Sequence, residues 1–112
     1  MEQKSTKKVL TVKYNYSMPT EEFKKITTSV ALKLAEISGL CWKIWLINED
    51  RKEAGGVYLF ESALELDRFL VSTLFAALRN NPAISNIQTN TFGVAEAQSA
   101  ITGAPLMNMV IS

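Results

Sequence analysis

Residues 39–62 read GLCWKIWLINEDRKEAGGVYLFES, and this stretch decides the fold class. Two apolar segments, 40–47 and 54–60, flank a charged turn at 48–53, a pattern typical of an antiparallel hairpin. Side chains alternate between the two faces of a strand. The alternation divides the first segment into two sets, Trp42, Ile44 and Leu46 on one face and Cys41, Lys43, Trp45 and Ile47 on the other. Both faces are largely apolar, so we expect both to be covered.

The hairpin has a strand and a helix on each side of it in sequence. Residues 8–16 alternate and are rich in β-branched and aromatic residues, which predicts a strand. Thr20 starts a helix whose apolar stripe runs from Phe23 to Ile37, with Gly39 as its stop. Ser62 with Glu65 three residues later forms a capping box for a second helix, which the segment RNNP at 79–82 ends. The predicted buried face of this helix comprises Leu66, Phe69, Leu70, Thr73, Leu74 and Ala77. Residues 84–94 form a long, rather polar last strand.

The resulting order, β-α-β-β-α-β, predicts an α+β, ferredoxin-like domain. It places both helices on one face of a four-stranded antiparallel sheet. Because the other face is also apolar, we expect an identical sheet from a second copy to cover it, forming a homodimer. The 112 residues fit one domain over 1–112, with a polar tail at 1–7 and a C-terminal extension at 95–112. That extension has a short helix near 95–101, and Met107 to Met109 are assigned to packing.

The composition excludes several classes of function. The net charge of +1 argues against a nucleic-acid partner. The longest apolar stretch, 69–78, is too short to cross a bilayer, so we expect no membrane partner. A single cysteine, Cys41, excludes an intrachain disulfide and favours a reducing compartment, the cytoplasm. The chain has no histidine, which removes the usual general base and the common zinc, iron and haem ligands. We therefore expect no metal site.

Two motifs have alternative interpretations that the residues disfavour. Gly55 and Gly56 suggest a phosphate loop, but they lie within a strand pattern, where a bulge or a close backbone approach is the better interpretation. The element order is also that of an RNA-recognition domain. Aligning its aromatic signature on Phe60 puts Gly55 and Val57 where stacking rings are needed, which disfavours RNA binding.

The same stretch carries a family resemblance. The run Trp42-Lys43-x-Trp45, the acidic turn and the block EAGGxYLF at 53–60 resemble the YdhR family of monooxygenases. The similarity extends upstream through the first strand and Pro19 and downstream through TFGVAEAQS at 91–99. The resemblance implies a dimeric α+β barrel, in which two ferredoxin-like protomers pack sheet against sheet. It also implies an oxygenase without cofactor, in which the anion of a small electron-rich phenol or quinol in a cavity of each protomer reduces oxygen directly.

For that chemistry the protein must bind an aromatic ring, help to remove a proton and stabilise an anion. Lys43 and Tyr58 are the predicted catalytic residues, Lys43 for stabilising a phenolate and Tyr58 for orienting a hydroxyl or transferring a proton. The predicted substrate-binding residues are Trp42, Trp45, Tyr14, Asn15, Phe60 and Phe92.

Each candidate also has a structural interpretation that the sequence leaves open. The tryptophans pack equally well in a core or at a dimer interface. Lys43 is as well explained by an ion pair with Glu53 across the hairpin. Asn15, with the polar residues of the last strand, fits solvent-facing positions. The alternative function is a non-catalytic, ligand-binding or stress-associated dimer with the same fold.

Overall fold

The computed structural model describes residues 6–106. Its strands are β1 (Lys8–Tyr16), β2 (Leu40–Asn48), β3 (Glu53–Phe60) and β4 (Ile84–Gly93). Its helices are α1 (Thr20–Leu34), α2 (Ala63–Leu70), α3 (Thr73–Asn80) and α4 (Glu96–Ile101). The expected strands all form, and their bounds agree with the sequence prediction to within a residue. The short helix expected near 95–101 is α4.

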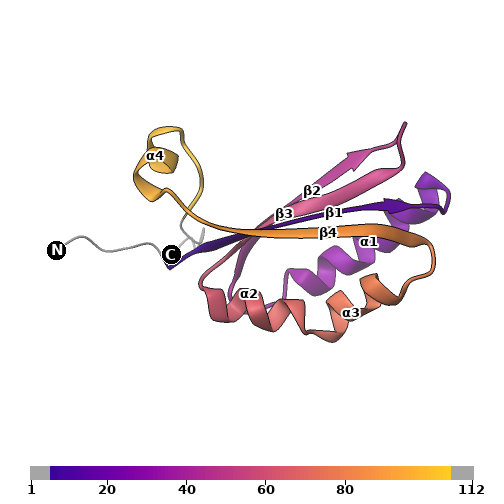
Figure 1. Cartoon of the computed structure of the whole chain (residues 1–112), viewed down its shortest axis with the longest axis horizontal. Coiled ribbons are helices and arrows are strands. Elements are labelled where there is room, and N and C mark those ends of the chain that lie inside the picture. Colours follow the sequence, from indigo (N-terminus) through magenta and orange to yellow (C-terminus); the bar gives the residue numbers. More distant parts are fainter. Residues whose placement is uncertain (1–5, 107–112) are drawn as a thin grey trace.

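The sheet is antiparallel, with the order β2-β3-β1-β4. Figure 1 shows α1, α2 and α3 together below this sheet and α4 beyond one end of it on the other side. The ferredoxin-like α+β prediction is therefore confirmed. We call the side of the sheet that carries Leu10, Tyr14 and Tyr58 the helix face, and the opposite side, which carries Trp42, Ile44 and Phe92, the open face.

The core lies on the helix face. Leu10, Val12, Tyr14 and Tyr16 are all buried, as their spacing of two along β1 requires. Phe23 of α1 stacks on Tyr16 with ring centroids 4.1 Å apart. Further along, the rings of Tyr58, Phe60, Phe69 and Phe75 form a continuous series of contacts, with successive centroids 5.0 to 5.9 Å apart. Aromatic packing therefore joins the sheet to all three helices beneath it.

The prediction of a single helix over about 62–81 is wrong. The chain forms α2 and α3, and Val71 and Ser72 interrupt them. The Ser72 hydroxyl accepts a hydrogen bond from the backbone N–H of Phe75, which caps a new helix, just as Ser62 caps α2 through Glu65. The interruption changes the helical phase, so Phe75, absent from the predicted face, is almost completely buried. The predicted Leu66 and Phe69 are buried as expected.

Gly39 does not end the first helix. That helix ends at Leu34, and Gly39 lies in the turn that leads into β2. Its φ of 90° and the hydrogen bond from Leu40 N–H to the Ile37 carbonyl describe a turn that requires a glycine at its third position. Ile37 still packs against the core, although it lies beyond the helix.

The close backbone approach predicted at the two glycines is confirmed for Gly55. A Cβ atom there would overlap the carbonyl oxygen of Val12 on the neighbouring strand. The described part of the predicted polar tail makes contacts with Glu61, which directly follows β3. Thr6 donates a hydrogen bond to the Glu61 carbonyl, and Lys7 pairs with the Glu61 carboxylate. The packing assigned to Met107 and Met109 falls outside the described residues.

Helices α1, α2 and α3 cover the helix face, whereas large apolar side chains on the open face are exposed in the single chain. Ile44, Leu46 and Phe92 are 53%, 47% and 55% exposed there. Toward the middle of the sheet this face becomes polar, and a hollow is lined by residues that include Lys13, Leu46, Val57, Gln88 and Asn90.

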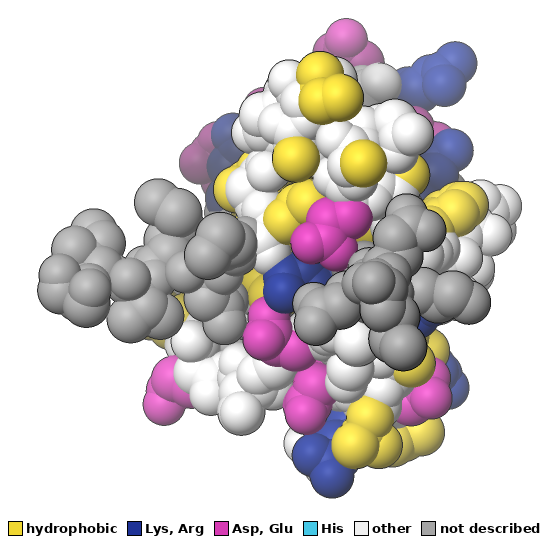
Figure 2. All heavy atoms as spheres, turned by 90° about the vertical axis from the view of Figure 1, so that its left-hand side faces the viewer, with side chains coloured by type: hydrophobic (Ala, Val, Ile, Leu, Met, Phe, Trp, Pro, Cys, Tyr) yellow, Lys and Arg dark blue, Asp and Glu magenta, His cyan; other side chains and the backbone are white. Residues whose placement is uncertain are grey.

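The end of the molecule near α4 has a mixed surface. Figure 2 shows acidic and basic side chains next to one another there, with hydrophobic side chains in small separate groups. Among the described residues of this end, Figure 2 shows no extended surface of one charge that would suit a polyanion. None of the helices within residues 6–106 is long and apolar enough to cross a membrane.

Candidate functional site

A cavity of about 190 Å³ lies between the helix face of the sheet and the helices. The sheet contributes Tyr14, Lys43, Trp45, Tyr58 and Ile84 to its lining; the helices contribute Phe23, Ile26, Thr27, Val30, Lys33, Leu34, Phe69, Leu74, Phe75, Ala77 and Leu78; Met18 and Asn81 complete it. The lining is mostly apolar and aromatic, with few polar groups, which is the usual composition of a small-molecule site. An apolar cavity of about 150 Å³ accommodates benzene in another protein. The space therefore suits a small aromatic molecule.

Lys43 brings an amine to this apolar cavity. Because β2 alternates, Lys43 and Trp45 lie on the helix face, and Lys43 pairs in register with Tyr58 of β3. Its Nζ lies 3.2 Å from the centroid of the Trp45 ring and 4.4 Å from that of Tyr58. The faces of both rings carry negative partial charge that attracts an ammonium group.

The alternative interpretation of Lys43, an ion pair with Glu53, is wrong. The Glu53 carboxylate lies 3.1 Å from Lys13 Nζ, on the open face. Within residues 6–106, no carboxylate pairs with Lys43, and the cavity lining contains no acidic residue. Burial without such a partner lowers the pKa of the Lys43 amine from 10.5 to about 7. Near neutral pH the group is therefore both a competent base and, once protonated, a local cation.

Gly56 makes room for this side chain. Gly56 lies on β3 and pairs with Trp45 of β2. A Cβ atom at Gly56 would lie 2.5 Å from Lys43 Cε and 2.9 Å from the carbonyl oxygen of Ile44. Any larger residue would displace the aliphatic part of Lys43 or strain the hairpin. Of the two adjacent glycines, Gly55 therefore allows the close approach of β1, and Gly56 leaves space for the Lys43 side chain.

Two phenols complete the polar part of the cavity. Burial raises the pKa of Tyr14 to about 12, and burial together with the nearby Tyr14 raises the pKa of Tyr58. Both hydroxyl groups therefore remain protonated at neutral pH and can donate a hydrogen bond. Among residues 6–106 neither has a hydrogen-bond partner, so both are available to a ligand.

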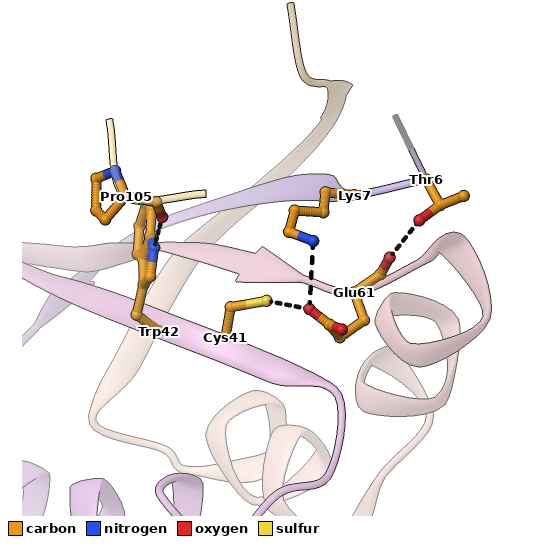
Figure 3. Close-up of polar contacts among 6 residues, drawn as sticks. All are labelled: Thr6, Lys7, Cys41, Trp42, Glu61 and Pro105. Atoms are coloured by element: carbon orange, nitrogen blue, oxygen red, sulfur yellow. Dashed lines mark hydrogen bonds and ion pairs between the residues drawn. The ribbon is translucent and has the colours of Figure 1, made fainter. Parts of the chain in front are cut away.

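The two tryptophans lie on opposite faces, as the alternation predicts, and only Trp45 lines the cavity. Trp42 is on the open face, and its indole N–H donates a hydrogen bond of 2.6 Å to the Pro105 carbonyl (Figure 3). The segment that follows α4 is thus attached to the sheet through Trp42. Because Trp42 lies on the opposite face of the sheet, its position does not support a direct role in this cavity.

The remaining predicted substrate-binding residues do not meet at the cavity. Phe60 lies behind it, stacked on Tyr58 with ring centroids 5.9 Å apart, and so supports the phenol without lining the space. Asn15 lies near the hairpin turn, donating to the Lys52 carbonyl and accepting from Asn86. Phe92 is on the open face. Of the eight predicted site residues, the structure brings together four: Lys43, Tyr58, Tyr14 and Trp45.

The helical half of the cavity was missed by reasoning from sequence. Thr27, Lys33 and Asn81 supply polar atoms there, and Phe69 and Phe75 supply rings. The apolar stripe of the first helix was recognised, but only as core. A signal for this half was present in the sequence. Thr27 and Lys33 lie three residues before and after Val30, so they were expected close to the apolar stripe that contains Val30.

Cys41 belongs to a separate cluster and does not line the cavity. Its thiol donates to Glu61 Oε1 at 2.8 Å, and Lys7 lies 3.5 Å from the same oxygen (Figure 3). Burial and the bond to Glu61 raise the pKa of Cys41 to about 12, while the bond from Cys41 lowers the pKa of Glu61. The thiol stays protonated and is a poor nucleophile. The cluster joins β2 to the N-terminal segment.

Across residues 6–106, no group of three or more acidic, cysteine or histidine side chains is arranged to hold a metal ion.

Solved structures share this architecture at low sequence identity. SnoaB of Streptomyces nogalater, described as a cofactor-independent oxygenase, superposes with a TM-score of 0.66 at 16% identity, over 81% of this chain and 95% of that one. A structure described as a putative antibiotic biosynthesis monooxygenase from Nitrosomonas europaea gives 0.68 at 12% identity, over 86% and 97%. MupZ of Pseudomonas fluorescens gives 0.68 at 13%, over 92% and 80%. These likenesses establish the fold.

A search of curated protein sequences finds no match. A family model, by contrast, matches residues 9–105, which include the four strands of the sheet, apart from Lys8 at the start of β1, and the four helices between and after them. The matched region includes Lys43, Trp45, Gly56 and Tyr58 and extends to Pro105, the residue that accepts the bond from Trp42. The chain therefore belongs to the family described as "Putative mono-oxygenase ydhR".

Proposed function

We propose that this protein is a cofactor-independent monooxygenase that oxidises a small phenol or quinol in the cavity beneath the sheet. The observation that supports it best is the Lys43 amine, which faces an apolar, aromatic-lined space without an acidic partner among the described residues. The family assignment agrees with oxygen chemistry, and SnoaB shows that the fold hosts it in a protein described as cofactor-independent.

The first step is proton removal. The neutral Lys43 amine accepts the phenolic proton, and the resulting ammonium pairs with the phenolate in a site of low polarity, where such a pair is strongly stabilised. Tyr58 and Tyr14, which remain protonated, donate hydrogen bonds to the same oxygen or to a second oxygen of the ring. Trp45 and Phe75 supply aromatic faces for the substrate ring.

The second step needs no group from the protein to carry electrons. The phenolate gives one electron to O₂, and the substrate radical and superoxide combine at a ring carbon to form a peroxide. The O–O bond then breaks, so that one oxygen atom remains as a carbonyl and the other leaves as water. The balance is phenol plus O₂ giving quinone plus water, and the apolar lining limits side reactions with solvent.

Oxygen uptake with a panel of one-ring and two-ring phenols and quinols tests this proposal. After dialysis against a chelator, we expect uptake above the protein-free rate and, with ¹⁸O₂, one labelled oxygen in the quinone. Lys43→Met should lower the rate by at least about 100-fold, the lower range for a general base. Lys25→Met, on the exposed side of α1, should not. Absence of uptake across the panel contradicts the proposal. Binding without turnover, measured by tryptophan fluorescence, favours the alternative, a ligand-binding or stress-associated dimer.

We also propose that two copies pair through the open face. Three large apolar side chains, Ile44, Leu46 and Phe92, are about half exposed there, and a second copy would remove them from water. Closed twofold dimers are the commonest assembly of soluble proteins. Sedimentation of the chain at micromolar concentration measures its mass; a monomer throughout contradicts this part of the proposal.

A further inference from the structure

Lys43 differs from the ion-paired lysines of the same protein. Lys7, Lys13 and Lys24 each lie within 3.5 Å of a carboxylate oxygen. Lys43 has no such partner among residues 6–106, and its stem lies in the space left by the missing Cβ of Gly56. Its amine is instead bounded by two ring faces and by the apolar cavity, which is partly open to solvent. Lysines that attack carbonyl groups are commonly partly withdrawn from water in an apolar pocket that a small ligand can enter, and Lys43 is half-buried in such a place.

From this arrangement we infer that Lys43 is a nucleophilic amine that captures small aromatic aldehydes in the cavity as covalent imines. The inference shares the cavity with the proposed function but not its oxygen chemistry. An aromatic aldehyde fits for the same reason as a phenol, since its ring is small and the walls include Trp45, Phe69 and Phe75. Forming the imine replaces a charged group that is costly to bury with a neutral one.

The chemical balance is simple. The Lys43 nitrogen lone pair forms a bond to the carbonyl carbon, and the carbonyl oxygen takes up a proton to give a carbinolamine. This intermediate loses water and leaves a C=N bond between Nζ and the former carbonyl carbon. No oxidant or reductant is needed. Burial supports the step, because it lowers the pKa of Lys43 to about 7 and leaves much of the amine neutral near that pH.

Reductive trapping with benzaldehyde and cyanoborohydride tests the inference on the intact chain. The hydride converts the imine into a stable benzyl-lysine, which peptide mapping by mass spectrometry assigns to one of the nine lysines or to the α-amino group. At pH 7 an ordinary lysine is only about 0.04% neutral. We therefore expect Lys43 to be labelled at least about tenfold faster than Lys33, the other lysine that lines the cavity.

Three controls separate cavity chemistry from general amine reactivity. Unfolding in urea should abolish the preference for Lys43, and an excess of toluene, which has no carbonyl group, should slow its labelling by occupying the cavity. The preference should shrink as the pH is raised from 7 to 10, since a lysine in water becomes increasingly neutral over that range. The other titratable groups of the cavity are Tyr14 on β1, Tyr58 on β3 and Lys33 on α1, and α3 contributes none. Lys25→Arg should leave the preference unchanged.

Equal labelling of Lys43 and Lys33 at pH 7, or no label on Lys43, overturns the inference. This test uses the wild-type chain and does not depend on the folding of a variant. Lys43→Arg retains a cation but lacks a nucleophilic amine, and it should lose the fast-labelled site. Labelling and oxygen uptake are separate measurements. Selective labelling without uptake supports the inference and contradicts the proposed function; uptake without labelling does the reverse.

Discussion

The two faces of β2 belong to the same nine residues and have different chemistry. On the helix face, Lys43 and Trp45 line an apolar cavity together with Tyr14 and Tyr58. On the open face, Ile44 and Leu46 are about half exposed and have no described helix above them. The difference shows that apolar character alone does not indicate what a strand contacts. On its helix face, β2 places the Lys43 amine beside an apolar cavity, with no carboxylate partner among residues 6–106. On its open face, β2 presents half-exposed apolar side chains that a second chain could cover.

The largest effect on stability is expected at Phe60, and Phe92 on the opposite face is its comparison. Phe60 is fully buried and touches Tyr58 and Phe69, so Phe60→Ala should lower the free energy of unfolding by about 3–5 kcal/mol. Phe92 is 55% exposed, so Phe92→Ala should change the stability of the protomer by less than about 1 kcal/mol. Urea unfolding at low protein concentration measures both. Equal losses would mean that the faces do not differ in burial as described.

The pH dependence of stability tests the unpaired state of Lys43. The pKa of Lys43 is about 7 in the folded chain, against the ordinary value of 10.5 expected in the unfolded chain. Between these two pH values the unfolded state binds more protons than the folded state, so the free energy of unfolding rises with pH. Comparison with Lys43→Met isolates this contribution, because Tyr14 and Tyr58 are present in both proteins. We expect the wild type to gain up to a few kcal/mol relative to the variant between pH 6 and pH 10, since one pKa unit corresponds to about 1.4 kcal/mol. A difference independent of pH would show that the amine is paired or hydrated.

A smaller effect is expected from a charge on the open face. Ile44→Asp places a carboxylate at the proposed interface and should weaken dimerisation by at least about tenfold, equivalent to about 1.4 kcal/mol. Ile47→Asp is the matched control, because Ile47 has similar exposure, 46% against 53%, but lies on the helix face. Sedimentation at several concentrations compares the two. Dissociation by both substitutions, or by neither, would contradict association through the open face.

The sequence by itself determined the positions of the four strands along the chain, their bounds and the separation of Trp42 from Trp45. These features depend on local periodicity, on turn residues and on the alternation of side chains along a strand, all of which are visible in neighbouring residues. It also pointed to Lys43, because a lysine in a strand apolar on both faces is unusual. The interruption at Val71 and Ser72 was missed, because a serine within an amphipathic run is compatible with a continuous helix.

Only the tertiary structure decided which face holds the cavity and which residues meet there. Lys43 lacks the expected partner because Glu53 points to the opposite face and pairs with Lys13. Phe75 reaches the core because Ser72 starts a new helix. Phe92 and Asn15 lie away from the cavity because their positions depend on the pairing of β4 with β1, which joins residues 68 to 85 positions apart. Such contacts depend on packing between distant segments, and no local pattern contains them.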